Sequence, residues 1–192
     1  MGIKNYVGFP DNKLKQIKSI IIQVNDAIGK AYAMHMKDTD GEIFVKWFGV
    51  GDRLVVRNIL HKMNYAMLNG VVTINYNTNN CTPNTNAVAY APAYGWNVAT
   101  VAQARSPISN FVIDICPRLL EQMSLLSSDK QSQIGTVVHE ISHLLGGTDD
   151  IVDPLTGHVA YGANLSKSLA RHNPDLAIMN AENYGFYISE FK

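Results

Sequence analysis

The chain has 192 residues, of which 16 are basic and 16 are acidic, so its formal net charge at pH 7 is zero. A chain of this length can bury a core of its own, and we expect one monomeric domain over residues 1–192. We do not expect nucleic acid as a partner, because a chain without net positive charge has no general attraction to polyanions. We do not expect a membrane either, because the longest apolar runs are far shorter than the roughly 20 residues that span a bilayer.

The predicted elements follow an order of helices, sheet and helices. Apolar residues at spacings of three and four predict helices over residues 11–36 and 52–68. From residue 71 to residue 115 the pattern changes to short β-rich runs, which predict a small sheet: "VVTINY", "NAVAY", "WNVATVA" and "NFVIDI". Helical patterns return over residues 117–126, 129–145, 162–171 and 180–190, with Ser128 or Asp129 as the cap of the second of these. This order indicates an α+β fold.

The stretch His139-Glu140-Ile141-Ser142-His143 matches the pattern H-E-x-x-H inside a predicted helix. Residues four apart lie on one helix face, so the two imidazoles can converge on one ion, and zinc accepts neutral imidazole nitrogen. Glu140 is rotated about 100° from His139 and is the candidate general base toward a water molecule. The alternative is a chance match on a solvated helix, but the flanking residues are apolar on nearly every side of this helix.

A third ligand has to come from elsewhere, and Asp149, Asp150 and Asp153 follow the helix directly. The spacing H-E-x-x-H-x-x-G-x-x-D ends on Asp149, as in a metzincin with Asp in place of the last His, and Met179 would then supply the Met-turn. Each aspartate has a simpler interpretation as a solvated turn residue. The other histidines, at positions 35, 61, 158 and 172, have no partner at ligand spacing and are expected on the surface.

A wider set of motifs resembles one family. "GGTDD" followed by "AYG" resembles the G-T-x-D-x-x-Y-G signature of the aspzincin metallopeptidases, the family of deuterolysin and peptidyl-Lys metalloendopeptidase. "KWFG", "GTVVHEISH", "KSLA" and "NPDLAIMNAENYGFY" resemble stretches of the same family in the same order. The resemblance implies a zincin-like fold with N-terminal helices, a small mixed sheet and C-terminal helices that carry the metal site.

The resemblance also implies roles for individual residues. His139, His143 and Asp150 would bind one zinc ion, Glu140 would be the catalytic base, and the hydroxyl of Tyr161 would stabilise the oxyanion. Ten residues, 151–160, separate Asp150 from Tyr161 where the family has two, so this insert has to loop out if Tyr161 is to keep its place. A purely structural tyrosine is the alternative.

The expected activity is hydrolysis of internal peptide bonds in proteins or peptides, with the substrate added as a strand to a sheet edge near "NAVAYAP". In peptidyl-Lys members two acidic residues receive the lysine that follows the scissile bond. Glu182 stands at the first of these positions and Gly185 at the second, so we expect a looser basic or mixed preference. A solvated helix residue is the other interpretation of Glu182.

Cys81 and Cys116 are the only cysteines, and the residues alone allow either two buried thiols or one disulfide. The resemblance implies the disulfide and action outside the producing cell. The first fifteen residues show no secretory signal, so a mature form, a catalytic domain of a larger protein and a delivered toxin stay open. Two rival functions also remain, namely a non-catalytic metal-binding or recognition domain and a metzincin-like peptidase that uses Asp149.

Overall fold

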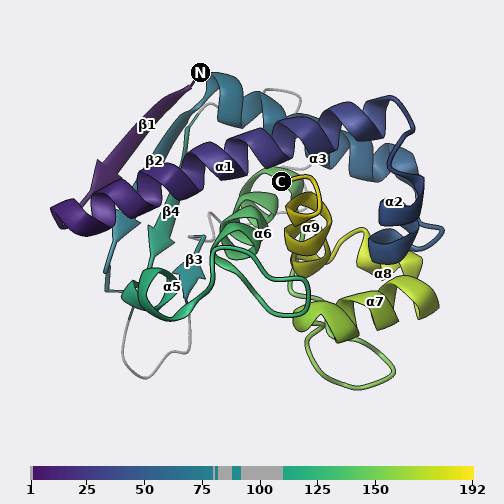
Figure 1. The fold of residues 1–192 in the computed structure, drawn as a ribbon. Coiled ribbons are helices and arrows are strands. Elements are labelled where there is room, and N and C mark those ends of the chain that lie inside the picture. Colours follow the sequence, from purple (N-terminus) through teal and green to yellow (C-terminus); the bar gives the residue numbers. More distant parts are fainter. Residues whose placement is uncertain (1, 80, 82–87, 92–109) are drawn as a thin grey trace.

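The computed structural model describes residues 2–79, 81, 88–91 and 110–192. Helices pack on a small sheet, and the long helix α1 crosses the sheet in Figure 1. This arrangement confirms the expected α+β class. None of the helices in these ranges is both long and apolar enough to cross a membrane. The described helices are α1 (Asp11–Met36), α2 (Gly41–Phe48), α3 (Arg53–Asn69), α5 (Pro117–Gln122), α6 (Gln133–Gly146), α7 (Gly162–His172), α8 (Pro174–Ala177) and α9 (Ala181–Ser189).

The sheet has the strand order β1-β2-β4-β3 and is mixed, as expected. Its strands are β1 (Ile3–Val7), β2 (Val71–Tyr76), β3 (Ala89–Tyr90) and β4 (Asn110–Ile115). β1, β2 and β4 run parallel, whereas β3 pairs antiparallel with β4 and lies at one edge of the sheet among the described strands. The predicted strand "WNVATVA" lies outside the described residues. Among the described strands, β3 is thus the edge strand that lies beside the helices.

The core lies mainly between the sheet and the helices α1, α3, α6 and α9, and α2 adds three buried aromatic side chains to it. The buried stripe of α1 repeats at spacings of three and four, as its sequence pattern predicts, because this spacing keeps apolar side chains on one helix face. α6 is buried on almost every side, and Figure 1 shows it beside α9 beneath α1. A helix in this position can hold polar side chains away from water only if they have partners.

Several sequence predictions need correction. β1 and α2 were not predicted, because neither segment is long enough to show a clear period. The helix predicted over residues 117–126 ends at Gln122. The start predicted at residue 129 is wrong, since α6 begins at Gln133 and Ser132 caps it by accepting from the N–H of Gly135 at 3.1 Å. The Ser127 hydroxyl instead holds residues 127–130 in a turn, accepting from the N–H of Lys130.

Of the four histidines expected on the surface, those at positions 61, 158 and 172 are exposed, but His35 is buried. It is fully buried at the end of α1, and its Nδ1 lies 2.7 Å from Oδ2 of Asp40. Arg53 forms an ion pair with Asp40, and the Tyr187 hydroxyl donates a hydrogen bond to it. Burial alone would raise the pKa of Asp40, but the hydrogen bonds from Tyr187, His35 and Arg53 lower it below its usual value. This cluster ties α1, α3 and α9 together far from the sheet.

We predict that Asp40→Ala lowers the free energy of unfolding by about 3 kcal/mol at pH 7, because buried donors lose their charged acceptor. Urea denaturation measures the change. The pKa of Asp40 is depressed in the folded state, so its stabilising contribution is present above about pH 4 and is lost as the pH falls through the folded-state pKa. The control is Asp26→Ala, which removes an exposed pair with Lys30, and equal losses in both variants would contradict the prediction.

Candidate metal centre

Helix α6 brings the two histidines of the H-E-x-x-H stretch together. Nε2 of His139 and Nε2 of His143 lie 3.0 Å apart, and Oδ1 of Asp150 lies 3.2 Å from the first and 3.5 Å from the second. All three ligand atoms lie within 4.8 Å of one another, so the group can hold a metal ion. No other such group of histidine, cysteine or acidic side chains occurs in the described ranges.

Both imidazoles are held through the nitrogen that faces away from the group. Nδ1 of His143 lies 2.8 Å from the carbonyl oxygen of Thr148, and Nδ1 of His139 lies 3.1 Å from Oε2 of Glu182. Each Nδ1 can donate a proton to its oxygen, so each Nε2 can offer a lone pair when a metal ion binds. Oδ1 of Asp150 is buried and has no hydrogen-bond partner among the described residues. These groups fit a divalent cation that accepts nitrogen and carboxylate ligands, such as zinc.

The turn after α6 decides which aspartate reaches the histidines. Gly147 adopts the left-handed conformation that ends the helix, with φ of 70°. Asp149 then pairs through its backbone with Met179 and Ala181, and its own carboxylate accepts from the N–H of Asp150 at 2.8 Å. Successive side chains of extended backbone point in opposite directions, so Asp150 faces the histidines and Asp149 does not. Met179 serves here as a backbone partner of Asp149.

The insert of residues 151–160 does loop out and return. Val152 bridges Val159, and the N–H of Ala160 donates to the carbonyl oxygen of Ile151 at 2.8 Å. Figure 1 shows this loop projecting below α7. The third aspartate, Asp153, is buried inside the loop, where its carboxylate accepts from the N–H of Leu155. The two ends of the insert therefore lie side by side, and the chain resumes close to Asp150.

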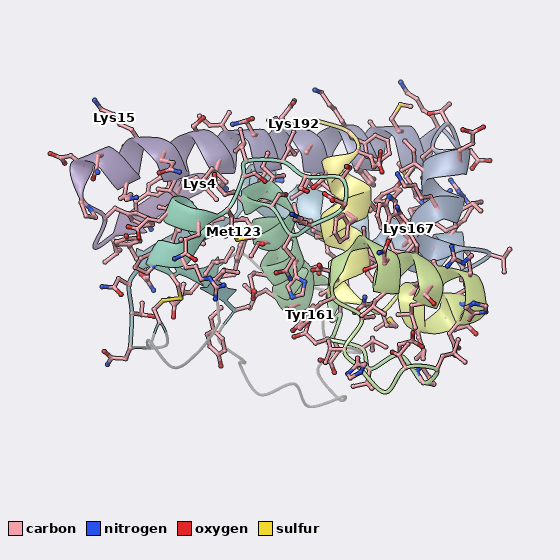
Figure 2. All side chains as sticks on the ribbon, turned by 60° about the horizontal axis from the view of Figure 1, so that its bottom comes forward. Lys4, Lys15, Met123, Tyr161, Lys167 and Lys192 are labelled. Carbon is pink, nitrogen blue, oxygen red and sulfur yellow. A yellow bond between two sulfur atoms is a disulfide. The ribbon has the colours of Figure 1, made fainter. Side chains whose placement is uncertain are left out.

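Tyr161 lies directly after the insert and reaches the metal group. Its hydroxyl donates to Oδ2 of Asp150 at 2.6 Å, and its ring centroid lies 6.0 Å from that of His139. Its side chain is partly open to solvent, with 43% of the residue exposed, and Figure 2 shows it near the end of α6. Burial and the neighbouring Asp150 raise the pKa of Tyr161 well above its usual value. Its hydroxyl therefore stays protonated and able to donate at neutral pH.

Glu140 is buried next to this group and is not a member of it. Burial raises the pKa of Glu140, and the nearby His139 and His143 oppose the rise. Its carboxylate also accepts a hydrogen bond from the backbone of Ala91, the residue that follows the edge strand β3. Glu140 thus stands between the metal group and the sheet edge.

The electrostatics of the group favour a cation. Burial on its own would lower the pKa of His139, but close contacts with Asp150 and Glu182 raise it to about 10. Burial would likewise raise the pKa of Asp150, and the two imidazoles hold it well below its usual range. Asp150 on one side of the His139 ring and Glu182 on the other therefore stabilise positive charge at this imidazole.

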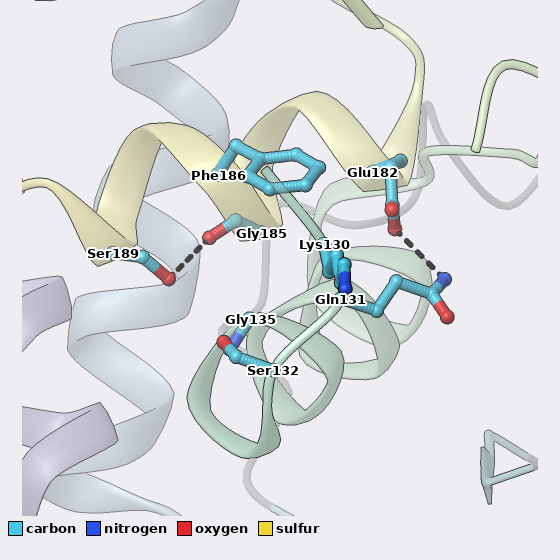
Figure 3. A pocket seen from close by; sticks show the side chains of 8 residues that line it. All are labelled: Lys130, Gln131, Ser132, Gly135, Glu182, Gly185, Phe186 and Ser189. Carbon is cyan, nitrogen blue, oxygen red and sulfur yellow. Dashed lines mark hydrogen bonds between the residues drawn. The ribbon is translucent and has the colours of Figure 1, made fainter. Parts of the chain in front are cut away.

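Glu182 is not a solvated helix residue, since only 3% of it is exposed. It contacts His139, the N–H of Gly162 at 2.9 Å and the side-chain amide of Gln131 at 3.3 Å. It also borders a small pocket, which is shown in Figure 3 and is lined by Lys130, Gln131, Ser132, Gly135, Glu182, Gly185, Phe186 and Ser189. A Cβ on Gly185 would lie 2.7 Å from the carbonyl oxygen of Gly135, so no acidic side chain fits there while α6 and α9 keep this distance.

Sequence reasoning missed Asn180, which is fully buried between the insert and α9. Its Oδ1 accepts from the N–H of Ile151 at 3.1 Å, and its Nδ2 donates to the carbonyl oxygen of Ala160 at 3.3 Å. One side chain thus joins both ends of the insert. The only available signal was its position in "NPDLAIMNAENYGFY", and that stretch does not reveal its partners.

Cys81 and Cys116 form a disulfide with a Cα–Cα distance of 5.3 Å, so the interpretation as two free thiols is wrong. Figure 2 shows the bond near the sheet. Cys116 follows β4, and its N–H donates to the carbonyl oxygen of Val88, next to β3. The disulfide therefore joins the chain before β3 to the end of the strand with which β3 pairs.

Comparisons with known proteins agree with this geometry. An aspzincin family model, described as "Lysine-specific metallo-endopeptidase", matches residues 33–189. The chain is 47% identical over 58 residues to a peptidyl-Lys metalloendopeptidase of Grifola frondosa, a match of 29% of this chain and 14% of that protein. It is 36% identical over 80 residues to a neutral protease 2 homolog of Blastomyces gilchristii (strain SLH14081), which covers 41% of this chain and 20% of that protein. The chain thus matches well under two thirds of the length of these relatives.

The fold is shared with a solved structure, a zinc peptidase from Grifola frondosa. The two structures superpose with a TM-score of 0.69 at 21% sequence identity, over 95% of this chain and 97% of the other. The likeness shows that the two chains share a fold over nearly all of this chain.

We predict that Asp150→Asn weakens zinc binding at least about tenfold, because it removes the anionic oxygen that faces both imidazoles. Asp149→Asn is the matched control and should bind zinc as the wild type does, since its carboxylate faces the backbone of the turn. Competition with a chromogenic chelator measures both affinities. Loss of zinc from the Asp149 variant alone would favour the metzincin-like arrangement.

Proposed function

The chain belongs to the aspzincin family, and on this basis we propose that it is a zinc-dependent endopeptidase that hydrolyses internal bonds of proteins or peptides. The observation that carries the proposal is the meeting of His139, His143 and Asp150 at one point with Glu140 buried beside it. A metal-binding domain without activity would not need an acid that stays outside the ligand group. Asp149 faces the turn, which disfavours a metzincin-like ligand set.

In the proposed mechanism, His139, His143 and Asp150 would hold a zinc ion, which would supply Lewis acidity toward a water molecule and a peptide carbonyl. Glu140 accepts the proton of the attacking water and passes it to the leaving amine. Its raised pKa favours the first of these steps, since a stronger base takes the proton more readily. The Tyr161 hydroxyl, protonated at neutral pH, donates to the oxyanion that forms on the carbonyl oxygen.

We propose that an extended substrate adds to the edge strand β3, in the predicted stretch "NAVAYAP". β3 pairs with β4 on one side, and Ala91, directly after it, donates to Glu140. A peptide along this edge would therefore pass the catalytic base. Main-chain hydrogen bonds would hold such a peptide without requiring one sequence.

We propose that the chain acts outside the producing cell, as a monomer with a single catalytic domain over residues 1–192. The disulfide supports this location, because such bonds persist in oxidising compartments. The zero net charge gives no general attraction to nucleic acid.

The proposed specificity is broad, and it includes lysine after the scissile bond without requiring it. Glu182 stands at one of the two positions that the resemblance assigns to lysine recognition, and Gly185 leaves no space for an acid at the other. Because both oxygens of Glu182 already contact donors of the protein, a lysine ammonium gains little at this site and the preference weakens.

We predict that Glu140→Gln lowers kcat by about 10²–10⁴-fold and leaves the zinc content unchanged, because only the proton acceptor is lost. Casein or peptide cleavage and elemental analysis of the same samples measure the two quantities. Glu121→Gln, an exposed acid paired with Lys13, is the control and should keep full activity. A Glu140 variant that cleaves as fast as the wild type would rule out this mechanism, and so would a wild type without zinc.

We further predict that a mixed peptide library is cut before several residue types, lysine among them. Mass spectrometry of the products maps the cut sites, and the same digestion with a chelator identifies cuts that need the metal. Cleavage before lysine alone would contradict the proposed broad specificity.

A further inference from the structure

The carboxylate of Glu182 joins three segments that are far apart in the sequence. It lies in the first turn of α9, where the positive end of the helix dipole favours an anion. Its Oε2 contacts Nδ1 of His139 on α6 and the amide of Gln131 before that helix, while its Oε1 accepts from the N–H of Gly162. These contacts are buried. Both oxygens are thus engaged by the protein itself.

The contact with His139 fixes the imidazole in one orientation and one tautomer. With the proton on Nδ1 directed at Glu182, Nε2 must face His143 and Asp150, which is the arrangement a metal ligand needs. His143 receives the same support from a backbone carbonyl, Thr148. Only the His139 side of the group depends on a side chain that a substitution can remove.

The contact with Gly162 holds the chain directly after Tyr161. Gly162 has a φ of 79°, a conformation that other residues rarely adopt, and its N–H donates to Oε1 of Glu182 at 2.9 Å. The Tyr161 hydroxyl at the same point reaches Asp150. The position of this tyrosine after a ten-residue insert therefore depends on Asn180 at the ends of the insert and on Glu182 at its exit.

We propose that Glu182 is a positioning residue that fixes the positions of His139 and Tyr161 relative to each other, and that it is not the recognition group for a substrate lysine. The test of this inference by catalysis rests on the proposed function, whereas the test by metal binding does not. A carboxylate with donors on both oxygens has little capacity left for an ammonium group.

The test compares Glu182→Gln and Glu182→Ala with the wild type. Glutamine keeps the volume but offers one acceptor oxygen, so it can serve His139 or Gly162 and not both. The matched control is Glu190→Gln, at the other end of α9, where the carboxylate accepts from Lys46 and Trp47 instead. Zinc dissociation constants come from chelator competition, and the absorption spectrum of the cobalt(II) form reports the ligand geometry.

We expect Glu182→Gln to weaken zinc binding about 10–100-fold and to change the cobalt spectrum, with Glu190→Gln like the wild type in both. With saturating zinc, kcat should fall by a similar factor for peptides with lysine and with norleucine after the scissile bond, at unchanged KM. Tyr161→Phe should cost less activity in the Glu182→Gln background than in the wild type, because Tyr161 is already displaced there. If Glu182→Ala does not fold, Glu182→Gln carries the test alone.

Wild-type zinc affinity in Glu182→Gln would overturn the proposal. So would a selective loss of cleavage before lysine with an unchanged cobalt spectrum, since that pattern identifies a substrate-recognition residue. A wild type that binds zinc but cleaves no peptide would overturn the proposed function, while the zinc affinities of the variants would still decide the role of Glu182.

Discussion

Helices α6 and α9 meet at Gly135 and Gly185, where an added Cβ on Gly185 would lie 2.7 Å from the opposing carbonyl oxygen. This close contact brings Glu182, one turn earlier on α9, within hydrogen-bond distance of His139. A larger residue at Gly185 would separate the helices and remove that support from the imidazole. The same contact leaves no space for an acidic side chain at position 185, so the packing of two helices constrains both the metal group and the proposed substrate preference.

The segment after α6 reverses direction and brings Asp150 back toward the two histidines of that helix. Gly147 ends the helix, Asp149 pairs with the chain before α9, and Asp150 then turns back to the two imidazoles. The ten-residue insert closes through a backbone bridge, and Asn180 joins both of its ends. An insertion that closes on itself costs little loop entropy at its base, because its length does not change the distance between the flanking residues. Tyr161 therefore reaches Asp150 despite the longer connection.

The sheet contributes its edge to the site. β3 has only two residues, and it is held by pairing with β4 and by the nearby disulfide. The N–H of Ala91 beyond β3 contacts Glu140, so the candidate base is linked to the strand along which a substrate is proposed to bind. A change that loosens this edge would alter the surroundings of Glu140 and the substrate surface together.

The sequence by itself determined the long helices, the α+β class and the histidine pair, because helical spacing and the H-E-x-x-H pattern are local properties of the chain. Local spacing favoured Asp149, and only the family resemblance pointed to Asp150. Tertiary structure decided that Asp150 faces the histidines, that Glu182 is buried against His139, and that His35 joins a buried cluster with Asp40. β1 and the start of α6 also depended on pairing and on a turn at Ser127. These features arise from contacts between segments distant in the sequence or from competing side-chain hydrogen bonds, and neither leaves a periodic signal.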